Sequence, residues 1–254
     1  MKIRTGFVSN SSSSSFVVKN FDRGLIEPLL LEFVESVDCG DFEMYSNDPE
    51  IKKHYDKYKY GIKQCMMNKM HLPEKKLDLY LSIYVRGQLY SLFNAMINYY
   101  IAKRNLELVG CENCCYHKDI GRGSKGKCKG CIFHFDYRHK VENAEKIKWY
   151  KSDFPEFSFD DKEQEIEKLV AAFEVVENDG VKTVAPDWKM FHELTDKWED
   201  EYYDIWCEKY PNAFVFSFAS DDGDDTEMFM RCHINEFVSF MRENGVDGFR
   251  GENS

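Results

Sequence analysis

Five of the nine cysteines in this 254-residue chain cluster in one short segment and form two Cys-x-x-Cys pairs. A Cys-x-x-Cys turn places two thiolates around one ion, and two such turns complete the tetrahedral sulfur shell of a structural Zn²⁺ site. Residues 121–127, between the pairs, are rich in glycine, so the chain can fold back and bring the second pair to the first. The spacing therefore predicts one zinc ion bound by Cys111, Cys114, Cys128 and Cys131.

The ligand set has alternatives within the same segment. Cys115 could replace Cys114, and His117 and His134 are further candidates. An iron–sulfur cluster or a redox pair is the chemical alternative to zinc. Disulfides are disfavoured, because the number of cysteines is odd and the sequence shows no secretory signal. Four protein ligands are typical of a closed structural site, since a catalytic zinc keeps a position for water. We interpret the remaining cysteines as core residues: Cys39, Cys65, Cys207 and Cys232.

Positive charge is concentrated around the cysteines. Residues 103–148 contain eleven Lys or Arg and six Asp or Glu, whereas the whole chain has a net charge of −11. A basic module on an acidic body could contact nucleic-acid phosphates, or its lysines could simply keep a small exposed loop soluble. The candidate phosphate contacts lie on the glycine-rich loop and its exit: Arg122, Lys125, Lys127 and Lys129.

A second candidate site is the acidic loop at residues 221–227. Its carboxylates could hold Mg²⁺ or Ca²⁺ and serve a metal-dependent enzyme acting on nucleic acid. Asp and Gly are also the residues that tight hairpin tips prefer for backbone reasons, and we favour this second interpretation. The chain carries no phosphate-binding glycine loop, no Gly-x-Ser-x-Gly and no His-Glu-x-x-His motif. The sequence gives no positive reason to expect an enzyme.

The opening residues carry a resemblance. Residues 6–16 read Gly-Phe-Val-Ser-Asn, five serines and Phe, which resembles the start of many uncharacterised bacteriophage and bacterial proteins. The cysteine segment also resembles the small zinc modules of phage proteins, with Tyr116 soon after the first pair and Ile132 after the second. The resemblance implies a phage or prokaryotic origin, and it implies no activity.

Periodicity predicts the elements that position these residues. Apolar residues at helical spacing predict helices over 23–37, about 49–70 and 88–104, after Asp160 and Pro186, and from about Asn235 to Gly245. Alternation predicts strands at 77–85 and 132–137, and a hairpin of 213–219 with 228–231. Asp160 should cap its helix, which should bury side chains as far as Val176. The tail from Gly251 should be loose.

Together these patterns predict an α+β protein with a zinc-ribbon-like insertion. We expect a Ser-rich segment at 1–18, half of the core at 19–108, the zinc module at 109–150 and the other half at 151–254. Segments 77–85 and 88–104 should share one core, because only Arg86 and Gly87 separate them. No apolar run reaches eighteen residues, so we expect no membrane contact and a cytoplasmic location, the host cytoplasm for a phage protein. The expected function is a non-catalytic zinc-containing adaptor with a protein partner; the alternative is the metal-dependent enzyme.

Overall fold

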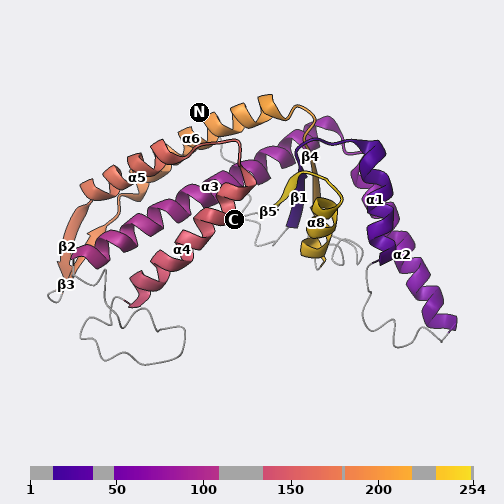
Figure 1. Cartoon of the computed structure of the whole chain (residues 1–254), viewed down its shortest axis with the longest axis horizontal. Helices are drawn as coiled ribbons and strands as arrows, with labels where there is room; N and C mark the ends of the chain where they lie inside the picture. Colours follow the sequence, from indigo (N-terminus) through magenta and orange to yellow (C-terminus); the bar gives the residue numbers. More distant parts are fainter. Residues whose placement is uncertain (1–13, 37–48, 109–133, 179–180, 219–232, 253–254) are drawn as a thin grey trace. The chain divides into compact units, whose positions relative to one another are not determined.

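The computed structural model describes residues 14–36, 49–108, 134–178, 181–218 and 233–252. The chain is an α+β protein of helices and two small antiparallel sheets, as the sequence predicted. It divides into two compact units, and we describe each by itself. Unit 1 contains residues 1–87 and 203–254, and unit 2 contains residues 88–202. Helices α3 (Glu74–Leu108) and α6 (Trp188–Lys209) each contribute residues to both units (Figure 1).

Unit 1 is built on a three-stranded sheet in the order β4-β1-β5. Strand β1 (Ser14–Val18) lies in the centre and pairs antiparallel with β4 (Phe214–Phe218) and β5 (Gly248–Glu252). This confirms the strand predicted at 213–219, and its predicted hairpin partner, 228–231, lies outside the described residues. The prediction of a loose tail from Gly251 is wrong, because the pairing of β5 with β1 extends to Glu252.

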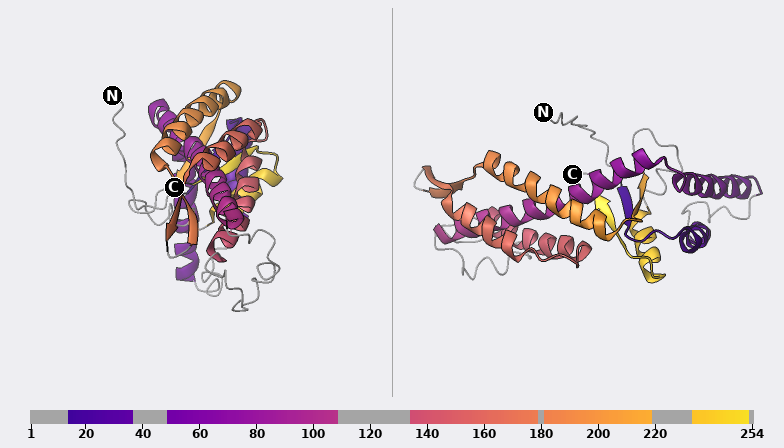
Figure 2. Two further views of the ribbon diagram at one scale, coloured as in Figure 1. Left: turned by 90° about the vertical axis from the view of Figure 1, so that its left-hand side faces the viewer. Right: turned by 90° about the horizontal axis from the view of Figure 1, so that it is seen from above.

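One face of this sheet packs against helices α1 (Arg23–Ser36) and α8 (Ile234–Glu243), as the views in Figure 2 show for α8. The side chains alternate along each strand, so Phe16 and its cross-strand neighbour Phe216 point to the same face. Phe237 of α8 lies edge-on to both rings. The buried cluster also includes Val18, Ile26, Leu30, Phe33, Phe214, Phe218, Val238 and Met241.

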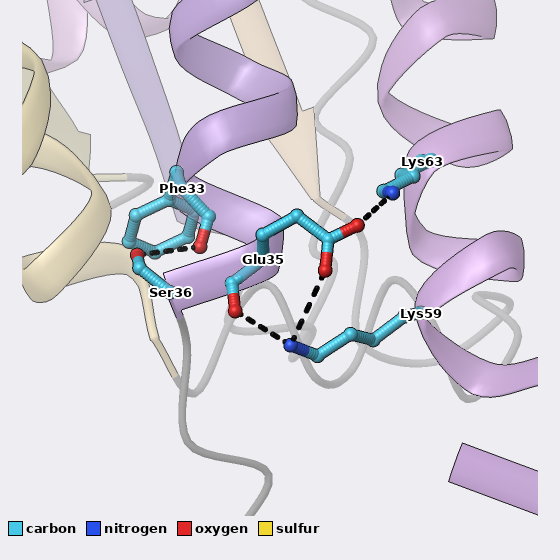
Figure 3. Close-up of polar contacts among 5 residues, drawn as sticks. All are labelled: Phe33, Glu35, Ser36, Lys59 and Lys63. Carbon is cyan, nitrogen blue, oxygen red and sulfur yellow. Dashed lines mark hydrogen bonds and ion pairs between the residues drawn. The ribbon is translucent and has the colours of Figure 1, made fainter. Parts of the chain in front are cut away.

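The C-termini of helices α8 and α1 are capped in different ways. At the end of α8, Gly245 has φ 83°. The Gly245 N–H donates to the Arg242 carbonyl, and the Val246 N–H donates to the Met241 carbonyl. These two hydrogen bonds form a Schellman motif. The C-terminus of α1 is instead closed by α2 (Pro49–Lys69): Lys59 donates a 2.6 Å hydrogen bond to the Glu35 carbonyl (Figure 3). The helices predicted at 23–37, about 49–70 and from about Asn235 are confirmed.

The prediction of a strand at 77–85 is wrong, because these residues lie in the first part of the single long helix α3. The apparent alternation came from Leu79 and Ile83, whose side chains are 56% and 38% exposed. The buried residues follow helical spacing instead: Leu81, Tyr84, Val85, Gln88, Leu89, Leu92 and Phe93. The helix runs through Arg86 and Gly87, and the boundary between the two units also lies there.

Unit 2 combines the second part of α3 with α4 (His134–Asp153), α5 (Asp160–Ala172) and the first part of α6. Its centre is aromatic, and Phe93 contacts the rings of Phe159, Trp198 and Tyr202. The Tyr202 hydroxyl donates to the Ser158 carbonyl at 3.0 Å, which satisfies a phenol that is otherwise buried.

A two-stranded hairpin completes unit 2. Strand β2 (Glu174–Asn178) pairs antiparallel with β3 (Val181–Ala185). The sequence analysis placed Val176 in a helix and missed this hairpin; β2 begins two residues after α5 ends. The sequence does contain a signal, since Asp179-Gly180 is a dipeptide typical of hairpin turns and follows the two β-branched residues Val175 and Val176.

Two further predictions in unit 2 need correction. The strand at 132–137 is wrong from His134 onward, because α4 begins there. Asp160 does not cap α5: Phe159 occupies the N-cap position without a side-chain cap, and Asp160 lies in the first turn, where its charge favours the helix dipole. The helix after Pro186 is confirmed, and the Asp187 carboxylate accepts from the Met190 N–H at its start.

Candidate functional site: the junction that carries the cysteine segment

Most sequence-predicted site residues lie outside the described part of the chain. This applies to Cys111, Cys114, Cys128 and Cys131, to the substitutes Cys115 and His117, and to Arg122, Lys125, Lys127 and Lys129. His134 is the first residue of α4. The acidic loop 221–227 also lies outside it, between the end of β4 and the start of α8. The structure therefore locates the two residues between which the cysteine segment is inserted, Leu108 of α3 and His134 of α4.

The two sides of this insertion are joined by one buried side chain, Asn105. Its Nδ2 donates to Oδ1 of Asp136, in the first turn of α4, at 3.0 Å. Its Oδ1 accepts the backbone N–H of Val184, in β3, at 2.8 Å. Asn105 is only 7% exposed, so both bonds form largely away from water. A single amide thus connects the end of α3, the start of α4 and the hairpin, which lie at the same end of unit 2 in Figure 1.

Arg104, the preceding residue, fixes the neighbouring segment. Its guanidinium donates to the carbonyl of Val170 and, at 3.0 Å, to that of Phe173. These carbonyls lie at the C-terminus of α5, where a cation is favourable and where the Phe173 N–H also donates to the Val170 carbonyl. Arg104 and Asn105 together hold α5, the hairpin and α4 against the end of α3. We call this set of contacts the Asn105 junction.

The basic residues that flank the insertion are largely engaged with carboxylates. Lys103 bonds Glu167 at 2.7 Å, and this hydrogen bond raises the pKa of Lys103. In α4, Arg138 pairs with Glu142 at 2.7 Å, and Lys148 pairs with Glu145 at 3.2 Å. Glu142 and Glu145 are already among the six acids counted over residues 103–148, so of these three partners only Glu167 offsets the positive surplus of that segment.

Unit 1 contains a separate polar cluster on α3 and α6. The Arg86 guanidinium lies 4.3 Å from the centre of the Tyr203 ring and donates to the Ser82 hydroxyl. Burial raises the pKa of Tyr203 and also that of the neighbouring Cys207 thiol. A raised pKa keeps the thiol protonated at neutral pH, so this environment does not activate Cys207 as a nucleophile. Cys207 and Cys65 are both half-buried, which is less than the core burial predicted for them.

Within the described ranges, no three His, Cys, Asp or Glu side chains come together as a metal site. In the same part of the chain, no helix combines the length and the apolar character that crossing a membrane requires. Asn105 was not predicted as a junction residue, because the sequence around an asparagine within a helix does not distinguish a buried, bonded side chain from a solvated one.

Comparisons of the chain with protein-family models, with curated proteins and with solved structures found no match.

Proposed function

We propose that this chain is a non-catalytic, zinc-containing binding protein in which the cysteine segment is a recognition module. Cys111, Cys114, Cys128 and Cys131 hold a structural zinc ion, and the Asn105 junction supports the module on unit 2. The observation that carries the proposal is the hydrogen bond between Asn105 and Asp136, because it joins the chain on either side of the segment that contains both Cys-x-x-Cys pairs.

The physical argument is one of loop closure. Bringing the two ends of a flexible segment together costs conformational entropy, and any contact that already holds them together lowers the cost of closing a site inside the loop. The Asn105–Asp136 bond meets this condition, and metal binding would supply folding free energy to a segment with few apolar residues. A module that leaves and re-enters the body at one place can present a surface to a partner without disturbing the core.

A protein partner agrees better with the surface charges than nucleic acid does. Lys103, Arg138 and Lys148 form ion pairs with carboxylates, and Arg104 is engaged by backbone carbonyls. The other cations of residues 103–148 are the four of the loop, Arg122, Lys125, Lys127 and Lys129, together with Lys118, Lys140 and Lys146. A short basic loop on a chain of net charge −11 would give weak, strongly salt-dependent binding to a polyanion.

Metal analysis tests the first half of the proposal. Protein purified without chelator should contain one zinc ion per chain. Cys128→Ser should remove the metal or unfold the segment, whereas Cys115→Ser should leave the zinc content unchanged. Absence of zinc from the wild-type chain would refute the proposal, and loss of zinc in Cys115→Ser would refute the ligand assignment.

Affinity capture tests the second half. The tagged wild-type chain should retain a protein from native or infected cells, and Cys128→Ser should lose it. Retention of single-stranded RNA or DNA at low salt, abolished by changing the four loop cations to Glu, would instead assign the module to nucleic acid, with a log–log salt slope of about −3 to −4 for four contacts. Turnover of nucleic acid that requires added Mg²⁺ or Mn²⁺ would favour the alternative, an enzyme using the acidic loop 221–227.

A further inference from the structure

The hairpin of unit 2 has one anchored edge and one open edge. The Val184 N–H donates to Asn105, so it points away from β2. In an antiparallel ladder both backbone groups of such a residue, and those of its cross-strand partner, point outward. Val184 faces Val175 in the register, and two residues along, Lys182 faces Glu177. The N–H and C=O groups of Val175 and Glu177 therefore point outward from the far edge of β2.

No element in the described part of the chain pairs with this outer edge of β2. No hydrogen bond among the described residues joins the outward backbone groups of Val175 or Glu177 to another element. Glu174, Glu177 and Asn178 are exposed, whereas Val184 in β3 is buried. The edge strands of unit 1 differ: in β5 the Gly248 carbonyl accepts from Arg242, and β4 leads directly into residues outside the described part.

The sequence of β2 is complementary to itself in the antiparallel direction. With a two-fold axis at Val176, Val175 of one copy lies opposite Glu177 of the other, and the two can exchange both of their backbone hydrogen bonds. Glu174 then lies opposite Asn178 of the other copy, so no two like charges are directly opposed. Lys182 lies opposite each Glu177 within its own hairpin and reduces the repulsion between the two Glu177 residues on the diagonal.

We propose that β2 is a self-association surface, through which a second copy of this chain adds its own β2 antiparallel about Val176 to make a four-stranded sheet. A five-residue strand provides less than the roughly 1,200 Å² that stable interfaces bury, so the dimer is weak and reversible. The Asn105 junction connects the hairpin to the base of the cysteine segment, so the dimer would carry two such segments. The pairing itself does not depend on zinc.

A cysteine cross-link tests the register. In a non-hydrogen-bonded antiparallel pair the two Cα atoms lie about 4.5 Å apart, which permits a disulfide. Val176→Cys should therefore form a covalent dimer under mild oxidation, confirmed by mass spectrometry of the 176–176 peptide. Asn178→Cys is the matched control, because its two copies would lie about 14 Å apart, beyond the reach of a disulfide. The wild-type chain, oxidised in parallel, accounts for the native cysteines.

Sedimentation of the full chain tests the association itself. The wild-type protein should shift from monomer towards dimer as its concentration rises to about 0.5 mM, a range that suits an interface below standard size. Val175→Pro should abolish the shift, because the proline ring blocks the outward edge while the N–H it removes is not used within the hairpin. Lys182→Pro makes the same backbone change on β3; it should weaken the shift, because it removes the positive charge beside Glu177, but should not abolish it. Circular dichroism checks that both variants fold.

Both results are required. A monomer at every concentration would overturn the proposal, and so would cross-linking of Val176→Cys that is no faster than that of Asn178→Cys. Capture of an extended peptide by β2 without self-association would assign the same edge to a different partner and would also overturn it.

Discussion

The sheet of unit 1 and the Asn105 junction of unit 2 bring distant segments together by different means. In the sheet, β1 and β5 are separated by most of the chain, and close apolar packing holds them: Phe16, Phe216 and Phe237 are fully buried. At the junction, three elements meet through the two hydrogen bonds of one asparagine. Contacts within a packed core tolerate almost no added volume, whereas a polar junction depends on the identity of a few donors and acceptors.

This contrast bears on function. A sheet closed by apolar packing should respond to any change with a loss of global stability, because its contacts are shared among many residues. The Asn105 junction depends on few hydrogen bonds, so its local stability can change without a change in the rest of the fold. The insertion between α3 and α4 is attached at this junction. Regions of low local stability are those from which binding segments are commonly drawn. The predictions that follow test whether the two regions differ in this way.

The largest effect is expected for Gly248→Ala in β5. A Cβ at Gly248 would overlap the Val17 carbonyl oxygen and lie 2.8 Å from the Phe16 ring, so either the backbone or the core must shift. We expect a loss of about 3 kcal/mol in the free energy of unfolding, measured by urea denaturation. Gly24→Ala in α1 is the control: its nearest atom is 3.3 Å away on a surface Asp22 side chain, and alanine favours a helix. Equal effects of the two changes would contradict the steric argument.

Asn105→Asp should have the next largest effect, a loss of about 2 kcal/mol in the free energy of unfolding at pH 7. The new carboxylate can still accept the Val184 N–H, but it has no donor for Asp136, and two carboxylates then face each other across about one hydrogen-bond length. Their repulsion raises a pKa of the pair in the folded state, so the loss should shrink as the pH falls from 7 towards 5.

Hydrogen exchange locates this effect. The Val184 amide should lose protection in an Asn105→Ala variant, while the amides of β1 keep theirs, if the junction can open independently of the sheet. Asn98→Ala is the matched control on the same helix, because the hydrogen bonds of the Asn98 side chain in the described part of the chain go to Asn94 within α3. A uniform loss of protection in both regions would show that the junction and the sheet unfold together.

Tyr84→Phe tests the polar contacts at the sheet itself, and we expect a loss of about 1 kcal/mol in the free energy of unfolding. The Tyr84 hydroxyl and the Ser217 hydroxyl are hydrogen-bonded at 2.7 Å, beside a ring that is only 3% exposed. Phenylalanine keeps the ring packing and removes the bond. Tyr60→Phe, at a side chain 63% exposed, should change nothing measurable in the same urea titration. A larger effect than that of Asn105→Asp would reverse the proposed contrast.

The same contrast explains which features were predictable from the sequence. Elements with one continuous apolar face were predicted correctly, as for Phe237, Val238 and Met241 of α8. Residues 77–85 were misassigned because Leu79 and Ile83 are exposed apolar residues that imitate the alternation of a strand. The junction could not be foreseen at all: hydrogen bonds from Asn105 to Asp136 and Val184 span 31 and 79 positions, and no local pattern encodes such pairs. The zinc assignment stays a prediction from spacing.

The smallest effect is expected for Glu35→Gln, at an exposed polar contact of unit 1. Lys63 donates a hydrogen bond to the Glu35 carboxylate and lowers its pKa (Figure 3). Because the folded-state pKa is lowered, this stabilisation exists above the unfolded-state pKa and disappears as the pH falls through the folded value. The side chain is 59% exposed, so water and salt screen the pair, and the contribution should stay well below 1 kcal/mol.

Urea denaturation of the wild type and Glu35→Gln at pH 7 and pH 3.5 should show a small difference in the free energy of unfolding that shrinks at the lower pH. Lys59→Met is the control, because Lys59 also donates to the Glu35 carbonyl, a group that does not titrate. The main-chain part of its effect should persist at pH 3.5. If Glu35→Gln costs as much as Asn105→Asp, burial is not what separates strong from weak polar contacts in this chain, and the distinct role assigned to the Asn105 junction fails with it.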